Sequence, residues 1–427
     1  MTKRLLCIIE NPHEVKSLVP ICELAEQKSH GQLSFHYVAQ DAYLFQGVEE
    51  ALRQRGVQNS SQLPICRSLR RPLPFHFLAV RWWVQYRSRF MVADLARNYD
   101  GLICGVDSSL ICILIDEMKR KGKPTCLVVG GIDYPHPKGK IPWNQRVKNI
   151  LRNAASRILP HAEYMRSVGL FNEHTSGCDH VFVAGEGTAE ALIARGVSRS
   201  TVKATGLPCF ASLFPIAPPR FPAASETFTI LYIGGAFAWH GMHSAQRRQS
   251  AQLQEFVQAF SQLPQRFRLL LRPHPREDRK AYDWLVGCDR IDISDLGRPL
   301  HDDLRSASLT LGMISNVLLE SLAFGVPSAS LTFTEDEGTR ITYNLSCPGG
   351  TIVELDSASA VLDFIREISL DERKYIDLVR SEVPVLQYNV ADSTPNAVNL
   401  IAEEIVESVL GKETFPSGVT IEMHVPC

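Results

Sequence analysis

Short apolar runs alternate with helical patterns along most of the chain, and this alternation restricts the fold more than any other feature. Residues 5–10 and 33–39 have the length and apolar character of buried strands, and the segment between them has helical spacing. The alternation resumes in the second half, with apolar runs at 228–233, 269–271 and 309–313. Strands that alternate with helices predict parallel sheets. We therefore predict an α/β protein with Rossmann-like, doubly wound sheets.

A proline- and alanine-rich stretch near the middle divides the chain into two halves. The 427 residues exceed what one ordinary hydrophobic core holds, and residues 208–225 combine several prolines with little periodicity. Two similar α/β halves predict ligand binding in a cleft between them. The predicted division is an N-terminal Rossmann-like domain over 1–215, a linker over 216–226, a C-terminal Rossmann-like domain over 227–390, and a helix and tail over 391–427.

The overall charge and the cysteine pattern exclude several classes of protein. A formal net charge of -1 gives no global field that would attract nucleic acid, so any anion site must be built locally. The 11 cysteines are scattered without a CxxC pair, which favours reduced thiols in a cytoplasmic protein over a zinc or disulfide framework. No apolar run reaches the roughly 18 residues of a membrane span. We expect no metal ion and no nucleic-acid partner.

One basic and aromatic segment interrupts the alternation. Residues 67–98 contain Arg81 and Trp82 among several other arginines and aromatic residues. One interpretation is a long helix with aromatic side chains in the core and arginines in solvent. The other is an interfacial helix that contacts anionic lipid at the inner membrane, with Arg81 and Trp82 binding a lipid-linked acceptor. The residues alone leave both interpretations open.

Two predicted strand-end loops carry residues suited to anion binding. Gly234 and Gly235 follow the strand at 228–233, and glycines there allow close approach of the backbone to a ligand. Arg272 and His274 precede prolines that hold them in extended geometry. Arginine can bind a phosphate with two hydrogen bonds, and histidine can donate one or transfer a proton near neutral pH. The alternatives are a tight glycine turn and a surface turn with a solvated histidine.

A third loop leads into a helix that contains Glu320. Ser315 is predicted to cap this helix, Asn316 adds an amide group, and Gly325 ends the helix. Backbone N–H groups at a helix start bind phosphates, so Ser315 and Asn316 predict a second phosphate contact. Glu320 is placed to accept hydrogen bonds from ribose hydroxyls, and its alternative is an exposed helix carboxylate.

Together, three motifs resemble nucleotide-sugar glycosyltransferases of the GT-B architecture. They are Ala-Thr-Gly-Leu-Pro at 204–208, Arg-Pro-His-Pro at 272–275, and the stretch from Ser315 through Glu320 to Pro327. The combination is similar to bacterial surface-polysaccharide enzymes: capsule Kdo transferases, sialyl- and polysialyltransferases with His-Pro and Ser motifs, and CDP-glycerol glycerophosphotransferases. The resemblance implies that His274 and Ser315 hold the donor phosphates and that His274 protonates the departing phosphate. The Asp-Tyr-Ser-Ser pattern of the glycerophosphotransferases is absent, which favours a CMP-activated acidic sugar.

The catalytic base is expected from the N-terminal domain, which would bind the acceptor. Asp133 and Glu186 each follow a predicted strand. An acceptor hydroxyl needs a carboxylate or imidazole within about 3 Å to take its proton. We favour Asp133 as the base and keep Glu186 as the alternative, for which capping of the following helix is the competing interpretation. His13 and His136 lie on strand-end loops and are candidates for acceptor binding.

The favoured hypothesis is a metal-independent GT-B glycosyltransferase. It would move a CMP-activated acidic sugar, such as Kdo or sialic acid, to a saccharide or lipid-linked glycan in surface polysaccharide synthesis. The nucleotide sugar is a co-substrate, and no separate cofactor is expected. A UDP-sugar transferase and a sugar-nucleotide 2-epimerase keep the fold and change the chemistry; the epimerase shares the Gly-x-Pro and Glu/Gly/Pro helix signatures. A non-catalytic protein that binds a nucleotide or glycan is the remaining alternative.

Overall fold

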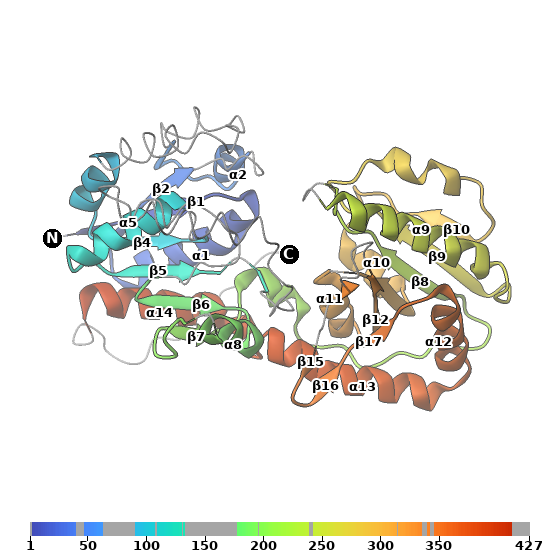
Figure 1. Cartoon of the computed structure of the whole chain (residues 1–427). Helices are drawn as coiled ribbons and strands as arrows, with labels where there is room; N and C mark the ends of the chain where they lie inside the picture. Colours follow the sequence, from blue (N-terminus) through green and yellow to red (C-terminus); the bar gives the residue numbers. More distant parts are fainter. Residues whose placement is uncertain are drawn as a thin grey trace.

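Two α/β domains lie side by side, each built on one parallel sheet (Figure 1). This arrangement confirms the predicted fold class, two Rossmann-like doubly wound domains. The structure is a computed structural model, and the part of the chain that it describes comprises residues 2–39, 47–62, 90–106, 109–129, 131–132, 177–194, 196–238, 242–313, 315–334, 340–341 and 346–411.

The N-terminal sheet has the strand order β3-β2-β1-β4-β5-β6-β7, and all of its strands pair in parallel. Its central strands β1, β4 and β5 are mostly apolar and are buried from Leu5 onward in β1 and throughout β4 and β5, because both faces of the sheet are covered. The strands are β1 (Lys3–Ile9), β2 (Leu33–Ala39), β3 (Ser60–Gln62), β4 (Gly101–Cys104), β5 (Thr125–Val128), β6 (His180–Val183) and β7 (Val202–Ala204). The helices are α1 (Pro12–Lys28), α2 (Val48–Gln54), α5 (Ser109–Arg120), α8 (Glu186–Ala194) and the 3-10 helix η1 (Pro208–Leu213).

The C-terminal sheet has the order β10-β9-β8-β11-β12-β17 and is also parallel. Two short antiparallel pairs lie outside it, β13 (Phe333–Thr334) with β14 (Arg340–Ile341) and β15 (Ser346–Cys347) with β16 (Gly350–Thr351). The sheet strands are β8 (Phe228–Ile233), β9 (Phe267–Arg272), β10 (Ile291–Ile293), β11 (Leu309–Gly312), β12 (Ser328–Leu331) and β17 (Val353–Leu355). The helices are α9 (His243–Phe260), η2 (Arg279–Leu285), α10 (Leu300–Ser306), α11 (Val317–Ala323), α12 (Ala358–Leu370) and α13 (Glu372–Asn389).

Helix α13 carries the chain back toward the N-terminal domain. It starts at Glu372 and continues through Pro384 to Asn389. Proline removes one helical hydrogen bond, and the burial of Val385 and Leu386 on the same helix offsets that loss. Short η3 (Thr394–Asn396) and α14 (Ala397–Leu410) follow.

Helix α14 belongs to the core of the N-terminal domain, although it is the last element in the described part of the chain. It packs against α1, and Ile401 and Ile405 are buried in the same cluster as Leu18 and Cys22. The chain that leads to it is fixed by a hydrogen bond from the Ala391 N–H to the Ala184 carbonyl. The sequence predicted this helix without predicting which domain it covers.

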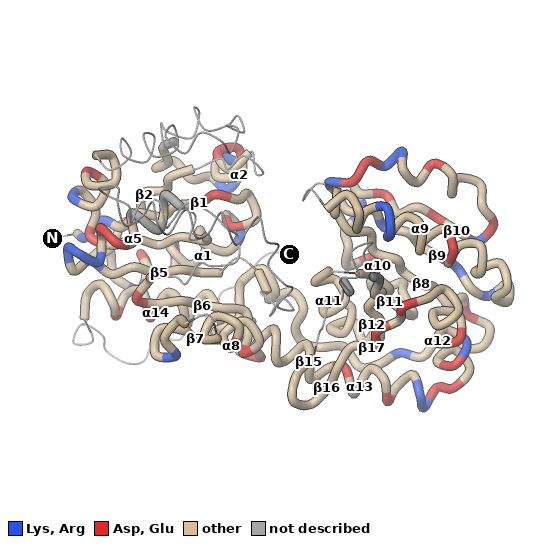
Figure 2. The backbone as a smooth tube through the Cα atoms, viewed as in Figure 1, with Lys and Arg blue, Asp and Glu red and all other residues tan. Residues whose placement is uncertain are grey.

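Charge and hydropathy are unremarkable across the described residues. Among them, no helix is both long and apolar enough to cross a membrane. Figure 2 shows Lys and Arg interspersed with Asp and Glu in both domains, in agreement with the net charge of -1. Any anion site therefore depends on a few local groups.

We predict that Gly185→Ala will lower the free energy of unfolding by about 1–3 kcal/mol, since overpacking typically costs this much. A Cβ at Gly185 would lie 2.5 Å from the Tyr388 carbonyl oxygen, so the returning chain would have to shift. Urea unfolding measures the loss. The matched control is Gly177→Ala, whose Cβ would make an ordinary contact of 3.6 Å with Ile115. Equal stability of the two variants would show that the returning chain is not tightly packed here.

Candidate functional site

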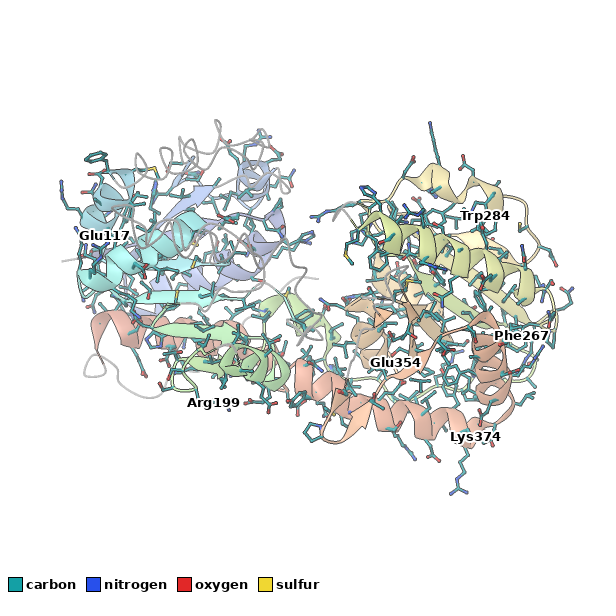
Figure 3. The ribbon with its side chains drawn as sticks, in the orientation of Figure 1. Glu117, Arg199, Phe267, Trp284, Glu354 and Lys374 are labelled. Atoms are coloured by element: carbon teal, nitrogen blue, oxygen red, sulfur yellow. The ribbon has the colours of Figure 1, made fainter. Side chains whose placement is uncertain are left out.

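In each sheet the strand order reverses beside the first strand, and open α/β sheets bind ligands at this point. Strand β1 lies between β2 and β4, and β8 lies between β9 and β11. Ligands bind beyond the carboxyl ends of these strands. The N-terminus, just before β1, and Phe267, the first residue of β9, both lie at the outer sides of their domains (Figures 1 and 3). The carboxyl ends of the parallel strands in each domain therefore point toward the other domain. We call the loops after β1, β8, β9 and β11 the interdomain site.

The loop after β1 contributes a histidine and a buried carboxyl group. Asn11 caps α1, since its side chain accepts a hydrogen bond from the His13 N–H at 3.0 Å. Glu14 is buried in the first turn, and its Oε2 accepts a hydrogen bond from the Glu10 N–H at 3.0 Å. Burial raises the pKa of Glu14 to about 7, although bonds from backbone N–H groups oppose the shift. Glu14 can therefore gain or lose a proton near neutral pH.

The two glycines after β8 are required by internal packing. The Gly234 N–H donates to the Arg272 carbonyl at 3.0 Å, and the Gly235 N–H donates to Gln249 Oε1 at 2.8 Å. A Cβ would lie 2.4 Å from Glu277 Oε2 at Gly234 and 3.0 Å from Gln249 Oε1 at Gly235. These contacts explain both glycines without a ligand. Nucleotide binding by Gly234 and Gly235 stays a prediction.

Arg272 forms a buried ion pair instead of pointing into an open loop. Its Nη1 lies 2.5 Å from Oδ2 of Asp303, which is fully buried, and its Nη2 donates to the Arg298 carbonyl at 2.9 Å. Ser294 Oγ donates to the same Asp303 oxygen at 2.5 Å. A buried carboxylate needs such compensation, so the guanidinium neutralises Asp303. The predicted phosphate contact of Arg272 would compete with this pair and stays a prediction.

His274 is held by both its backbone and its ring. Its N–H donates to Glu277 Oε2 at 2.8 Å, and its ring Nδ1 accepts a hydrogen bond from the Arg276 N–H at 3.1 Å. Because Nδ1 is an acceptor, the neutral ring carries its proton on Nε2. This tautomer suits donation of a hydrogen bond to a phosphate. Proton transfer from His274 to a departing phosphate stays a prediction.

The helix after β11 starts with the predicted capping contact from Ser315. Ser315 Oγ accepts a hydrogen bond from the Val317 N–H at 3.2 Å and so stabilises the first turn. Asn316 follows with helical dihedral angles, and its side chain makes no capping bond. Phosphate binding by Ser315 and Asn316 stays a prediction.

Glu320 is partly buried, unlike the exposed helix carboxylate that the sequence left as an alternative. Its side chain keeps 19% of its exposure, and burial raises its pKa to about 7. His301 Nε2 lies 3.9 Å from Glu320 Oε2. Burial and the charge of Arg305 lower the pKa of His301, which reduces its positive charge near neutral pH. The predicted contact of Glu320 with ribose stays a prediction.

The two domains approach each other at His13 and Arg276. The pKa of His13 is lowered first by burial and then by the positive charges of Lys16 and Arg276. Lys16 lies on the same helix as His13, whereas Arg276 lies on the loop after β9 in the other domain. An anion bound here would offset the positive charges of Lys16 and Arg276 that lower the pKa of His13.

A second approach of the two domains lies at Cys209, on η1. Burial raises the pKa of Cys209, a hydrogen bond with Ser17 opposes this increase, and the charge of Glu320 adds to it. Ser17 lies on α1 and Glu320 on α11. The loop that contains Arg276 and the helix that contains Glu320 are therefore close to the N-terminal domain. Both segments carry residues predicted to bind the donor.

Glu186 is a predicted site residue that does not join this arrangement. Glu186 begins α8, after β6, which β4 and β5 separate from β1. Its carboxylate binds Arg199 through hydrogen bonds of 2.8 and 3.0 Å at the surface. The four residues Asp133, His136, Arg81 and Trp82 lie outside the described residues. Within the described ranges, no group of three His, Cys, Asp or Glu side chains could hold a metal ion.

Sequence reasoning missed Glu14, Gln249 and Glu277. Glu277 follows the Arg-Pro-His-Pro motif by two residues, and this proximity was a usable signal. Gln249 is fully buried on the apolar face of α9, so a polar residue in the helical apolar stripe was a second signal. Nothing in the sequence indicated that Glu14 would be buried beside the Glu10 N–H.

A surface pocket away from the interdomain site has basic lining residues that are already bound to backbone carbonyls. It has a volume of about 350 Å³ and lies at the amino ends of β5 and β6. Lys119 in its lining donates to the Gly177 carbonyl, and Lys123 donates to the Arg97 carbonyl. Its basic groups are therefore used within the domain.

Comparison with known proteins shows the fold. The chain matches no family model and no curated protein. It is similar to the S. aureus protein MnaA in a co-structure with UDP, at 13% identity over 98% of this chain and 100% of that one, with a TM-score of 0.57. It is also similar to the UDP-GlcNAc 2-epimerase from Neisseria meningitidis bound to UDP-GlcNAc, at 13% identity over 95% of this chain and 100% of that one, with a TM-score of 0.55. A third similar structure is the UDP-GlcNAc 2-epimerase from Methanocaldococcus jannaschii in complex with UDP-GlcNAc and UDP, at 11% identity over 94% of this chain and 99% of that one, with a TM-score of 0.52. The chain thus has the same GT-B-like fold as these proteins.

We predict that Arg276→Gln will raise the pKa of His13, because it removes a positive charge that now lowers this pKa. NMR titration of histidine-labelled protein measures the pKa, and His13→Gln assigns the signal. Arg279→Gln is the matched control, since Arg279 is exposed and is not among the groups that shift His13. An unchanged pKa in Arg276→Gln would mean that the two domains do not approach at this point.

Proposed function

We propose that the protein binds a UDP-sugar at the interdomain site and inverts C2 of the sugar, as a sugar-nucleotide 2-epimerase. The approach of His13 and Arg276 from opposite domains carries this proposal, because the Arg276 charge and a hydrogen bond from the His13 ring suit the diphosphate of a nucleotide sugar. Solved structures with this fold support it, since two of them are 2-epimerases that hold UDP-GlcNAc. They favour UDP over CMP, and the epimerase alternative over the transferase that the sequence favoured.

The binding residues proposed for the nucleotide are those of the C-terminal domain. His274 would donate from Nε2 to a phosphate oxygen, and Arg276 would add a positive charge nearby. Ser315 and Asn316 would contact the same phosphates from the start of α11. Glu320, beside α1 and η1, would accept hydrogen bonds from the ribose hydroxyls.

Inversion at C2 requires groups that exchange protons near neutral pH. A C–H bond must break on one face of the sugar and form on the other, so both an acid and a base take part. The electron pair of the broken C–H bond would form a C1–C2 double bond as the C1–O bond to the diphosphate breaks, and the C1–O bond would form again when the proton returns to the other face. Glu14, in the N-terminal domain, has a carboxyl group with a pKa of about 7, and it follows His13 directly in the sequence. We propose Glu14 for this exchange and keep Asp133 as the second candidate.

The transferase alternative would use the same nucleotide site and an acceptor on the N-terminal domain. Asp133 or Glu186 would then deprotonate the acceptor hydroxyl, with His13 and His136 binding the saccharide. A lipid-linked acceptor and contact with the inner membrane would depend on Arg81 and Trp82. An epimerase needs none of these acceptor contacts, so the two functions differ in whether a second substrate is consumed.

We predict that the protein converts UDP-N-acetylglucosamine to its C2 epimer and incorporates deuterium at C2 in D2O, because the returning proton comes from an exchangeable group. Proton NMR measures both changes. His274→Ala should reduce turnover by about tenfold or more, the typical effect of losing a charge-assisted hydrogen bond. Lys374→Ala is the control, as Lys374 lies exposed on α13 at the outer side of the domain (Figure 3).

Two outcomes would contradict the epimerase proposal. Wild-type protein that leaves C2 fully protonated would exclude epimerisation of this substrate. Transfer of a sugar from a CMP-linked donor to a saccharide would favour the transferase instead.

A further inference from the structure

We infer that Glu277 is a positioning residue that holds the loops after β8 and β9 in the arrangement that binds a nucleotide diphosphate. This inference rests on the proposed function for its ligand, and on the contacts of Glu277 for its geometry. Glu277 lies in the turn after the Arg-Pro-His-Pro motif, beside the phosphate-binding candidate His274.

The Glu277 carboxylate accepts four hydrogen bonds from three separate segments. Oε2 accepts from the His274 N–H at 2.8 Å. Oε1 accepts from the Tyr282 hydroxyl at 2.7 Å, from Gln249 Nε2 at 3.0 Å and from Gln246 Nε2 at 3.1 Å. The donors belong to the loop after β9, to η2 and to α9. One carboxylate therefore joins the His274 turn to a helix that follows the glycine loop.

The two glutamines extend this connection to the glycine loop. Gln249 is 1% exposed, accepts a hydrogen bond from the Gly235 N–H at 2.8 Å and donates to the Gly235 carbonyl at 3.2 Å. Gln246 Oε1 accepts a hydrogen bond from the Ala238 N–H at 3.1 Å. Glu277 fixes the amide ends of both glutamines. The loop after β8 is thus set by side chains that Glu277 orients.

The arrangement requires a carboxylate at position 277. All four groups that face it are donors, and a carboxylate has acceptor sites for all of them. Glutamine has one acceptor oxygen, and its own NH2 group would face at least one of these donors. Gly234 leaves room for the carboxylate, since a Cβ there would lie 2.4 Å from Glu277 Oε2. The absence of a side chain at 234 and the charge at 277 therefore depend on each other.

The turn that Glu277 holds also carries His274 and Arg276, and the charge of Arg276 acts on the other domain. With its N–H bound to Glu277, His274 is placed so that Nδ1 accepts from the Arg276 N–H. This contact directs the Nε2 proton away from the turn. Arg276 follows two residues later, and its charge reaches His13 on α1. Glu277 thereby positions groups that would contact the phosphates without touching the ligand itself.

The test compares Glu277→Gln with Gln249→Met and with the exposed control Glu255→Gln on α9. Hydrogen–deuterium exchange without ligand is measured at residues 235–238 and 274–277, and UDP affinity is measured by calorimetry. We expect Glu277→Gln to accelerate exchange in both loops, and Gln249→Met to accelerate it at 235–238 only. UDP binding should weaken by about tenfold or more in Glu277→Gln, the usual effect of losing hydrogen bonds to a charged group.

Tyr282→Phe removes one of the four donors and keeps the carboxylate, so it provides a milder variant if Glu277→Gln does not fold. It should accelerate exchange at 274–277 and weaken UDP binding by about threefold. Unchanged exchange in both loops, in whichever of these variants folds, would overturn the inference. So would unchanged UDP affinity where the wild type binds UDP. A wild type that does not bind UDP would contradict the proposed function, while the exchange data would still decide the role of Glu277.

Discussion

The return of the chain to the N-terminal domain determines how the two sheets face each other. After α13, the Ala391 N–H binds the Ala184 carbonyl, and glycines at 185 and 206 leave room for Asn389 and Thr394. Helix α14 then completes the core against α1. The chain is thus held in both domains where it passes from α13 to α14. This connection brings the carboxyl ends of β1 and β8 toward each other, and the interdomain site depends on that approach.

The site itself consists of a few local charges in a protein with almost no net charge. Buried and partly buried carboxyl groups recur in it, but they have different surroundings. Glu277 is surrounded by donors, Asp303 is paired with Arg272, and Glu14 and Glu320 have their pKa raised to about 7 by burial. The first two therefore fit structural roles around the nucleotide loops. The last two are the ones suited to proton exchange or to hydrogen bonds with hydroxyl groups.

Local pattern predicted the elements well, because an apolar strand and its following turn are properties of neighbouring residues. It could not predict partners that are distant in the sequence. Arg272 had the features of a phosphate ligand, yet Asp303, 31 residues later, folds against it. The Gly234-Gly235 pair suggested a ligand loop, while the structure shows the Gly235 N–H bound to Gln249. Proline is unfavourable inside a helix, but α13 continues through Pro384, and Val385 and Leu386 after it are buried. In each case a tertiary contact changed the meaning of a local motif.

The central claim is that a uridine nucleotide binds between the domains and contacts both of them. Hydrogen–deuterium exchange with and without saturating UDP tests it most directly, with CMP as the comparison. The account predicts that UDP protects residues 272–277 and 315–320 of the C-terminal domain together with residues 10–16 of the N-terminal domain, and that CMP protects them less. Protection confined to other surfaces, or equal protection by CMP, would contradict it.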